Sequence, residues 1–216
     1  MSSKPGGLIL AGGQSRRMGR DKAGLTFGSE TLLARAVRHM APVAGPLVVS
    51  LAPGQVADPV LVGVGALAVR DTAPFGGPLP GLLQGFRALA ALKPAPEAVL
   101  VMPVDMPFYT GAWMERALAG LHGHAACLYR YEGFVNALVG AYRLSLLPKL
   151  EGLVDQPHAR PMGLSQGEPT LILEIESLWQ TEDGPPPLMD TDTPEDYAAA
   201  LQLEAIHSEG RGVDPA

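Results

Sequence analysis

Cations and small residues crowd the turn that follows the first apolar run of the chain. Residues 8–10 are apolar and bounded by glycines, which is typical of a buried strand. Ala11, Gly12 and Gly13 then leave the backbone N–H groups open to a ligand, because no bulky side chain blocks its approach. Four cations follow within seven residues, at Arg16, Arg17, Arg20 and Lys22. Backbone donors combined with clustered positive charge predict a binding loop for a polyphosphate.

Two familiar phosphate-binding motifs do not fit the spacing of this loop. A Walker A loop requires Gly-x-x-x-x-Gly-Lys-Ser/Thr, whereas Lys22 follows Asp21 and precedes Ala23. A Rossmann fingerprint requires Gly-x-Gly-x-x-Gly, which residues 12–15 do not supply. The segment is therefore a different kind of phosphate loop, with a solvated surface turn as the alternative.

Asp105 is the candidate metal ligand. It follows the apolar residues 98–102 and stands between Pro103 and Pro107, which restrict the local backbone. Mg²⁺ prefers one or two carboxylates together with phosphate oxygens and water, so a single rigid aspartate is sufficient. Capping of the next helix is the alternative role for Asp105, although Thr110 is better placed for it.

Alternation of short apolar runs with segments of helical spacing predicts an α/β fold with a mostly parallel sheet, a three-layer α/β/α sandwich. The expected strands are residues 7–10, 47–51, 67–70, 98–102, 125–129 and 171–175. The expected helices are residues 31–40, 82–89, 112–121 and 143–150, and a last helix that Thr193 caps and Pro194 begins. Residues 134–142 show a mixed pattern, and residues 154–169 are expected to form a loop. Residues 1–206 are thus expected to form one domain, followed by a disordered tail at 207–216.

The carboxyl ends of parallel strands meet at one edge of a sheet, where ligands bind. This rule brings together four positions that are far apart in the sequence, Gly12, Ser50, Asp71 and Asp105. The sequence therefore predicts a single site at that edge.

Composition excludes several classes of function. The chain has 216 residues, 47% of them apolar, and a net charge of −6, whereas a nucleic-acid surface requires a basic stripe. No apolar run approaches the roughly 20 residues of a membrane-spanning helix. The single cysteine, Cys127, excludes an internal disulfide framework and favours a reducing compartment, the cytoplasm.

The phosphate loop carries a family resemblance. Residues 10–23, Leu-Ala-Gly-Gly-x-Ser-x-Arg-Met-Gly-x-Asp-Lys-Ala, resemble the signature of the molybdenum cofactor guanylyltransferases, which have a Rossmann-like nucleotidyltransferase fold. The resemblance implies transfer of GMP from GTP to molybdopterin, with Mg²⁺ as the metal and pyrophosphate as the second product. It implies that Leu10, Ala11 and Gly12 line the nucleotide, with Gly13 beside them, and that Lys22 contacts its phosphates. Relatives that use CTP carry Ala-Ala-Gly where this chain has Ala-Gly-Gly, which favours guanine.

The resemblance also assigns roles outside the loop. Asp71 would contact the nucleotide, and residues 77–81 after it match the Gly-Pro-Leu-x-Gly of the family. The alternative is that the Asp71 side chain only stabilises an Asx turn. Asp105 would hold Mg²⁺, and Arg17 would join Lys22 in offsetting the charge of the triphosphate. Ser50 falls where the family commonly has asparagine. Asp192, also at an asparagine position, is either a second metal ligand or a helix cap.

The chain departs from the family pattern where the acceptor should bind. Asn136-Ala137 replaces a common Gln-Pro or His-Pro, and residues 157–169 have no clear match. Arg160 is the only guanidinium in that segment and is expected to pair with the phosphate of the acceptor, with a solvated arginine as the alternative. Three other functions stay open: a cytidylyltransferase, a relative with another acceptor, and a GTP-binding protein without turnover.

Overall fold

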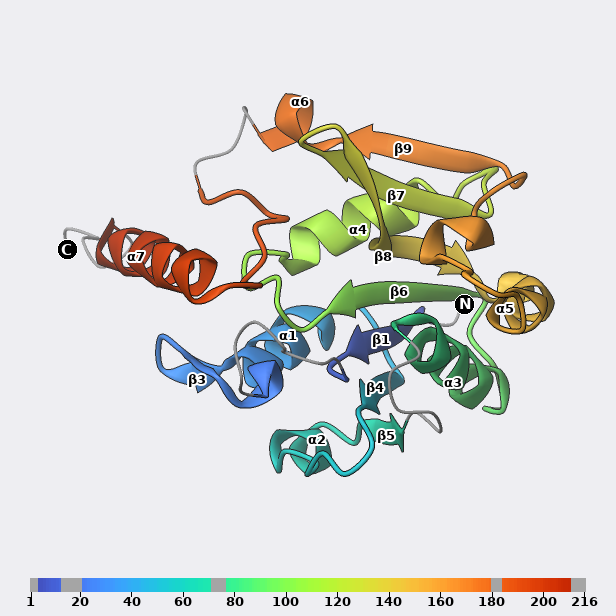
Figure 1. Cartoon of the computed structure of the whole chain (residues 1–216), viewed down its shortest axis with the longest axis horizontal. Helices are drawn as coiled ribbons and strands as arrows, with labels where there is room; N and C mark the ends of the chain where they lie inside the picture. The colour runs from blue at the N-terminus through green and yellow to red at the C-terminus, as the bar shows by residue number, and fades with distance from the viewer. Residues whose placement is uncertain (1–3, 13–20, 71–76, 180–183, 211–216) are drawn as a thin grey trace.

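The computed structural model describes residues 4–12, 21–70, 77–179 and 184–210 (Figure 1). Its strands are β1 (Gly6–Leu10), β2 (Thr26–Phe27), β3 (Glu30–Thr31), β4 (Leu47–Leu51), β5 (Leu67–Arg70), β6 (Ala98–Pro103), β7 (Ala126–Tyr131), β8 (Phe134–Arg143) and β9 (Thr170–Glu174). Its α-helices are α1 (Leu32–Met40), α2 (Val60–Gly63), α3 (Leu79–Ala90), α4 (Gly111–Ala119), α5 (Leu147–Val154), α6 (Ile175–Trp179) and α7 (Pro194–Gly210). Its short 3₁₀ turns are η1 (Lys22–Gly24), η2 (Leu144–Leu146) and η3 (Pro161–Leu164).

Within the described ranges, seven strands form the main sheet, in the order β5-β4-β1-β6-β8-β7-β9. β8 runs antiparallel to both of its neighbours, β6 and β7, and the other neighbouring pairs are parallel. The predicted mostly parallel sheet is therefore confirmed. Because β8 is reversed, its first residues lie at the edge where the other six strands end.

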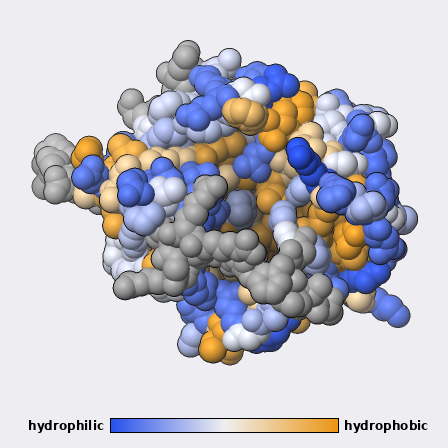
Figure 2. All heavy atoms as spheres, in the orientation of Figure 1, coloured by the Kyte–Doolittle hydropathy of each residue, from blue (hydrophilic) through white to orange (hydrophobic). Residues whose placement is uncertain are grey.

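Helices cover both faces of the sheet, as a three-layer sandwich requires. Successive side chains of a strand point to opposite faces. Accordingly Ile9 belongs to the core that contains α1 and α4, whereas Leu8 and Leu10 belong to the core that contains α3 and α5. Figure 2 shows hydrophobic surface in the middle of this face and toward its edges, interspersed with hydrophilic side chains.

The last helix lies at the opposite end of the molecule from α5 (Figure 1). The hydroxyl of Tyr197 donates to the carbonyl of Thr26, and the guanidinium of Arg35 pairs with Glu204. Arg35 itself is buried against the ring of Phe27. These contacts hold α7 against the β2–β3 hairpin and α1.

The second half of the chain differs from expectation in several places. Residues 134–142 lie in one strand, β8, whose pairing with β7 shifts register between Leu128 and Tyr129. Its later residues are buried on both faces, so they do not alternate in polarity. The expected loop at 154–169 contains η3. The last helix continues through His207 to Gly210, beyond the expected end of the domain. Among the described residues, no helix is both long and apolar enough to cross a membrane.

Candidate active site

The backbone after β1 turns closely over the end of β4. The N–H groups of Ala11 and Gly12 both donate to the carbonyl of Ser50, at 2.9 and 2.8 Å. A Cβ on Gly12 would lie 2.6 Å from the nitrogen of Ala52, so this position requires glycine. Ser50 is 1% exposed and holds this turn through its carbonyl. The expectation that the N–H groups of Ala11 and Gly12 stay open to a ligand is therefore wrong, because the Ser50 carbonyl accepts from both.

Lys22 connects three segments that are distant in sequence. It begins η1, where the Asp21 carboxylate accepts from the N–H of Ala23 at 3.0 Å. The Lys22 ammonium donates to the carboxylate of Asp105, after β6, at 2.8 Å. It also donates to the carboxylate of Asp192, before α7. The loop lysine and the candidate metal ligand are therefore in direct contact.

Neither aspartate occupies the N-cap position of the helix that follows it. Thr110, and not Asp105, occupies the N-cap position of α4, although its side chain makes no capping hydrogen bond. At the start of α7, the hydroxyl of Thr193 accepts from the N–H of Asp196, as predicted. Asp192 instead directs its carboxylate at Lys22.

Burial and mutual repulsion govern the charges of these groups. Burial raises the pKa of Asp105, the Lys22 ammonium opposes this shift, and the Asp192 carboxylate adds to it. Burial also raises the pKa of Asp190, with the charges of Asp192 and Asp105 adding to it. Burial disfavours the charge of Lys22, but Asp105 and Asp192 outweigh it and leave the Lys22 pKa raised. A cation between these carboxylates is thus strongly favoured.

The first cavity, of about 220 Å³, opens beside Lys22 at the carboxyl ends of β1 and β6. Its lining residues are Leu10, Ala11, Gly12, Lys22, Pro78, Pro103, Val104, Asp105, Leu138 and Asp192. Five residues predicted from the sequence for nucleotide or metal binding are among them: Leu10, Ala11, Gly12, Lys22 and Asp105. Ser50 is adjacent to this cavity but is not one of the described residues that line it.

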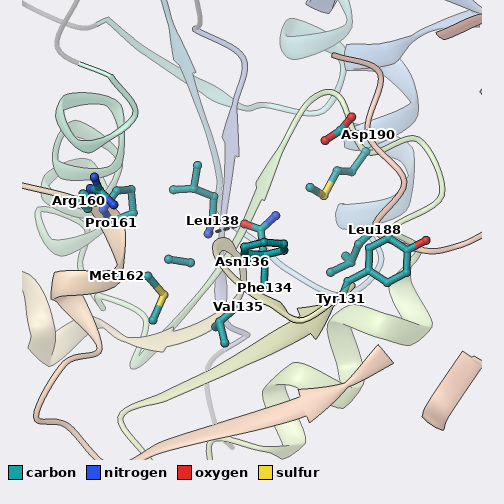
Figure 3. Close-up of a pocket in the computed structure, with 12 residues that line it drawn as sticks. Tyr131, Phe134, Val135, Asn136, Leu138, Arg160, Pro161, Met162, Leu188 and Asp190 are labelled. Atoms are coloured by element: carbon teal, nitrogen blue, oxygen red, sulfur yellow. Dashed lines mark hydrogen bonds between the residues drawn. The ribbon is translucent and has the colours of Figure 1, made fainter. Parts of the chain in front are cut away.

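The second cavity, of about 400 Å³, lies at the start of β8 (Figure 3). Its lining residues are Met106, Tyr131, Phe134, Val135, Asn136, Ala137, Leu138, Arg160, Pro161, Met162, Leu188 and Asp190. The two segments predicted to face the acceptor, Asn136-Ala137 and the Arg160 segment, thus line the same cavity. The amide oxygen of Asn136 accepts from the N–H of Leu138 at 3.0 Å (dashed in Figure 3), which fixes the amide orientation.

The two cavities adjoin. Leu138 lines both of them. The carboxylates of Asp105 and Asp192 border the first cavity, and Asp190 borders the second. This arrangement places two binding spaces on either side of one charged cluster, as a transfer between two bound substrates requires.

The sequence as a whole matches a known family. A model of the MobA-like NTP transferase domain matches residues 7–168. The chain belongs to this family. It is 38% identical, over 74% of its length and 79% of the relative, to the molybdenum cofactor guanylyltransferase of Cereibacter sphaeroides.

Two solved structures show the same fold. The molybdopterin-guanine dinucleotide biosynthesis protein A of Archaeoglobus fulgidus superposes with a TM-score of 0.72 at 17% identity, covering 93% of this chain and 99% of that one. The 4-diphosphocytidyl-2C-methyl-D-erythritol synthase of Anaerococcus prevotii superposes with a TM-score of 0.65 at 12% identity, covering 94% and 99%. The second of these names includes a cytidyl group, so the fold by itself does not select the nucleotide.

Three predicted site residues, Gly13, Arg17 and Asp71, lie outside the described residues, and their roles stay predictions. Sequence reasoning missed the contribution of Leu138 to both cavities and that of Phe134 to the second. The direction of β8 was the missing signal, because only a reversed strand brings residues 134–138 to this edge.

Proposed function

We propose that the protein transfers GMP from GTP to the phosphate of molybdopterin and releases pyrophosphate. The observation that carries this proposal is the pair of adjoining cavities with Lys22, Asp105 and Asp192 at their junction. GTP would occupy the first cavity and the acceptor the second. The family relationship to a molybdenum cofactor guanylyltransferase supports the choice of substrates.

In the proposed reaction, a phosphate oxygen of the acceptor attacks the α-phosphorus of GTP. A new P–O bond forms, the bond from the α-phosphorus to the bridging oxygen breaks, and pyrophosphate leaves. The protein contributes position and charge, because phosphoryl transfer requires little covalent help. Lys22 and Arg17 would bind the triphosphate oxygens. Leu10, Ala11 and Gly12 would line the nucleoside. The roles of Gly13, Ser50 and Asp71 in binding it stay predictions.

Nucleotidyltransferases of this family use a divalent metal, and we propose Mg²⁺ here. The carboxylates of Asp105 and Asp192 converge on one cation, the ammonium of Lys22, so this pair suits a positive ion. Among the described residues no group of three or more His, Cys, Asp or Glu side chains forms a metal cluster. Two carboxylates with phosphate oxygens and water match the preference of Mg²⁺. When bound, the ion would neutralise charge on the phosphate oxygens.

The second cavity suits an acceptor that combines a flat ring with a phosphate. Phe134 and Met162 offer apolar surface, being 81% and 40% exposed. Arg160 brings a guanidinium suited to bidentate binding of a phosphate. The Asn136 oxygen is occupied by Leu138, so its NH₂ group is left to donate to a ring edge.

Turnover with purified molybdopterin and a panel of GTP, CTP and ATP tests the proposal. We expect the guanine dinucleotide and pyrophosphate to form in equal amounts, with GTP preferred. Calorimetric titration with each nucleotide and Mg²⁺ should show the same preference. Turnover with CTP instead would indicate a cytidylyltransferase, and GTP binding without product would indicate a binding protein.

We also propose a cytoplasmic location. Cys127 is free and buried, so no disulfide contributes to this fold, and a reducing compartment suits it. Fractionation of cells with an antibody to the protein tests this location.

A further inference from the structure

Gln55 bridges three backbone segments beside the first cavity, although it does not itself border that cavity. Its side-chain oxygen accepts from the N–H of Ala52 at 2.8 Å. Its side-chain nitrogen donates to the carbonyl of Ala11 at 3.3 Å and to both carboxylate oxygens of Asp21 at 3.0 Å. One amide group therefore holds together the end of β1, the segment after β4 and the start of η1.

The bridge requires a group that both donates and accepts. Ala52 offers a donor, whereas Ala11 and Asp21 offer acceptors. Among side chains of this length, an amide meets both demands, whereas a carboxylate only accepts. Gln55 is in turn positioned by its own backbone: its carbonyl accepts from the guanidinium of Arg70 at 3.1 Å, and its N–H donates to the carbonyl of Ala52 at 3.1 Å.

The two residues that Gln55 holds stand directly before two parts of the site that meet the nucleotide in the proposed reaction. Ala11 borders the first cavity and precedes Gly12. Asp21 precedes Lys22 and caps η1 through the N–H of Ala23. A shift of Asp21 would therefore move the start of η1, and with it the ammonium that contacts Asp105.

We propose that Gln55 is a positioning residue for nucleotide binding, acting on Lys22 through Asp21 and on the end of β1 through Ala11. This inference rests on the proposed function for the identity of the nucleotide. It does not depend on the acceptor.

Gln55→Glu is the most informative substitution, because it preserves size, removes the donor and places two carboxylates against each other. We expect the Kd and KM for GTP to rise about tenfold, as loss of hydrogen bonds to a charged group implies. The KM for molybdopterin and the melting temperature should change little, because Gln55 lies on a partly exposed segment away from the second cavity. Gln156→Glu, at an exposed glutamine just after the end of α5, is the matched control for charge and should leave both constants unchanged.

The double variant Gln55→Glu with Asp21→Asn exchanges the amide and the carboxylate between positions 55 and 21. The amide introduced at position 21 would donate to the carboxylate introduced at position 55, while the amide oxygen still accepts from the N–H of Ala23. We expect this variant to recover most of the lost GTP affinity, since only the weaker bond to Ala11 remains missing. Rescue by exchange, together with an unchanged melting temperature in Gln55→Glu, is a result that a merely structural role for Gln55 would not produce.

The proposal would be overturned by unchanged GTP affinity in Gln55→Glu, or by a loss that the double variant does not restore in a folded protein. A fall in melting temperature with proportionate loss of all activity would also overturn it, because Gln55 would then be structural. If the wild type binds another nucleotide more tightly, the same variants are compared with that nucleotide. Failure of the guanine assignment is thereby distinguished from failure of the role of Gln55.

Discussion

The two cavities share a wall but differ in chemistry. The first contains a largely buried ion pair, with the Lys22 and Asp105 side chains 12% and 19% exposed. The second is open, and the side chain of Phe134 at its rim is mostly exposed. Charge is thus concentrated where bonds would be exchanged, and apolar contact where a ring would be recognised. Substitutions in the first cavity should therefore change turnover, and those in the second should change acceptor binding alone.

Asp105→Ala should reduce turnover more than any other single substitution. A smaller reduction would contradict the proposed difference in role between the two cavities. We expect turnover to fall by roughly 10²-fold or more, as on loss of one preorganised electrostatic group. Pyrophosphate release measures the rate, and circular dichroism should show a folded protein. A normal rate would remove Asp105 from metal binding.

Lys22→Ala should reduce turnover by a similar factor, roughly 10²-fold. Removal of the ammonium leaves the carboxylates of Asp105 and Asp192 without their cation and the triphosphate without a counter-charge. Pyrophosphate release and GTP titration measure the two consequences separately. Lys93→Ala, at a lysine outside both cavities, is the control.

Arg160→Ala should act on the second cavity only. We expect the KM for molybdopterin to rise several-fold while GTP affinity stays constant, because Arg160 lines only the acceptor side. Steady-state kinetics with each substrate varied in turn measures both constants. Arg87→Ala, at an exposed arginine of α3, serves as control, and an unaltered molybdopterin constant would make Arg160 a solvated surface residue.

The pH dependence of kcat/KM for GTP should test the role of the Asp105 carboxylate in the first cavity. A raised pKa keeps the Asp105 carboxyl protonated to higher pH than an ordinary aspartate. Activity that needs the carboxylate should therefore fall as the pH drops through that raised pKa. Asp192→Asn removes a negative neighbour, lowers the Asp105 pKa and should move the acid limb of kcat/KM for GTP to lower pH. Asp155→Asn, at an exposed aspartate, should leave the limb in place.

Phe134→Ala should have the smallest effect on the fold. The exposed side chain adds little to stability, so the free energy of unfolding should change by less than about 0.5 kcal/mol. Denaturant unfolding measures this change, and the KM for molybdopterin should still rise. Val62→Ala, at an exposed residue remote from both cavities, should change neither quantity.

Local patterns in the sequence were sufficient to predict the parallel strands β1, β4, β5 and β6 and half of the residues that line the first cavity. Apolar runs mark β1, β4, β5 and β6, and the rule for parallel strands places Gly12, Ser50 and Asp105 at one edge. The signals are local because a buried strand and a glycine turn each depend on neighbouring residues. The start of β8 could not be placed in this way, because the direction of a strand depends on its partners.

The amino-acid sequence was enough to find the phosphate loop, with Lys22, and the aspartate after β6. The folded chain was needed to show that Lys22 pairs with Asp105, 83 positions away, and with Asp192, 170 positions away. It was also needed to show that Gln55 bridges Ala11 and Asp21. A residue's type and its neighbours reveal what it is able to bind, whereas its actual partner is set by how the strands are ordered and how the helices pack on them.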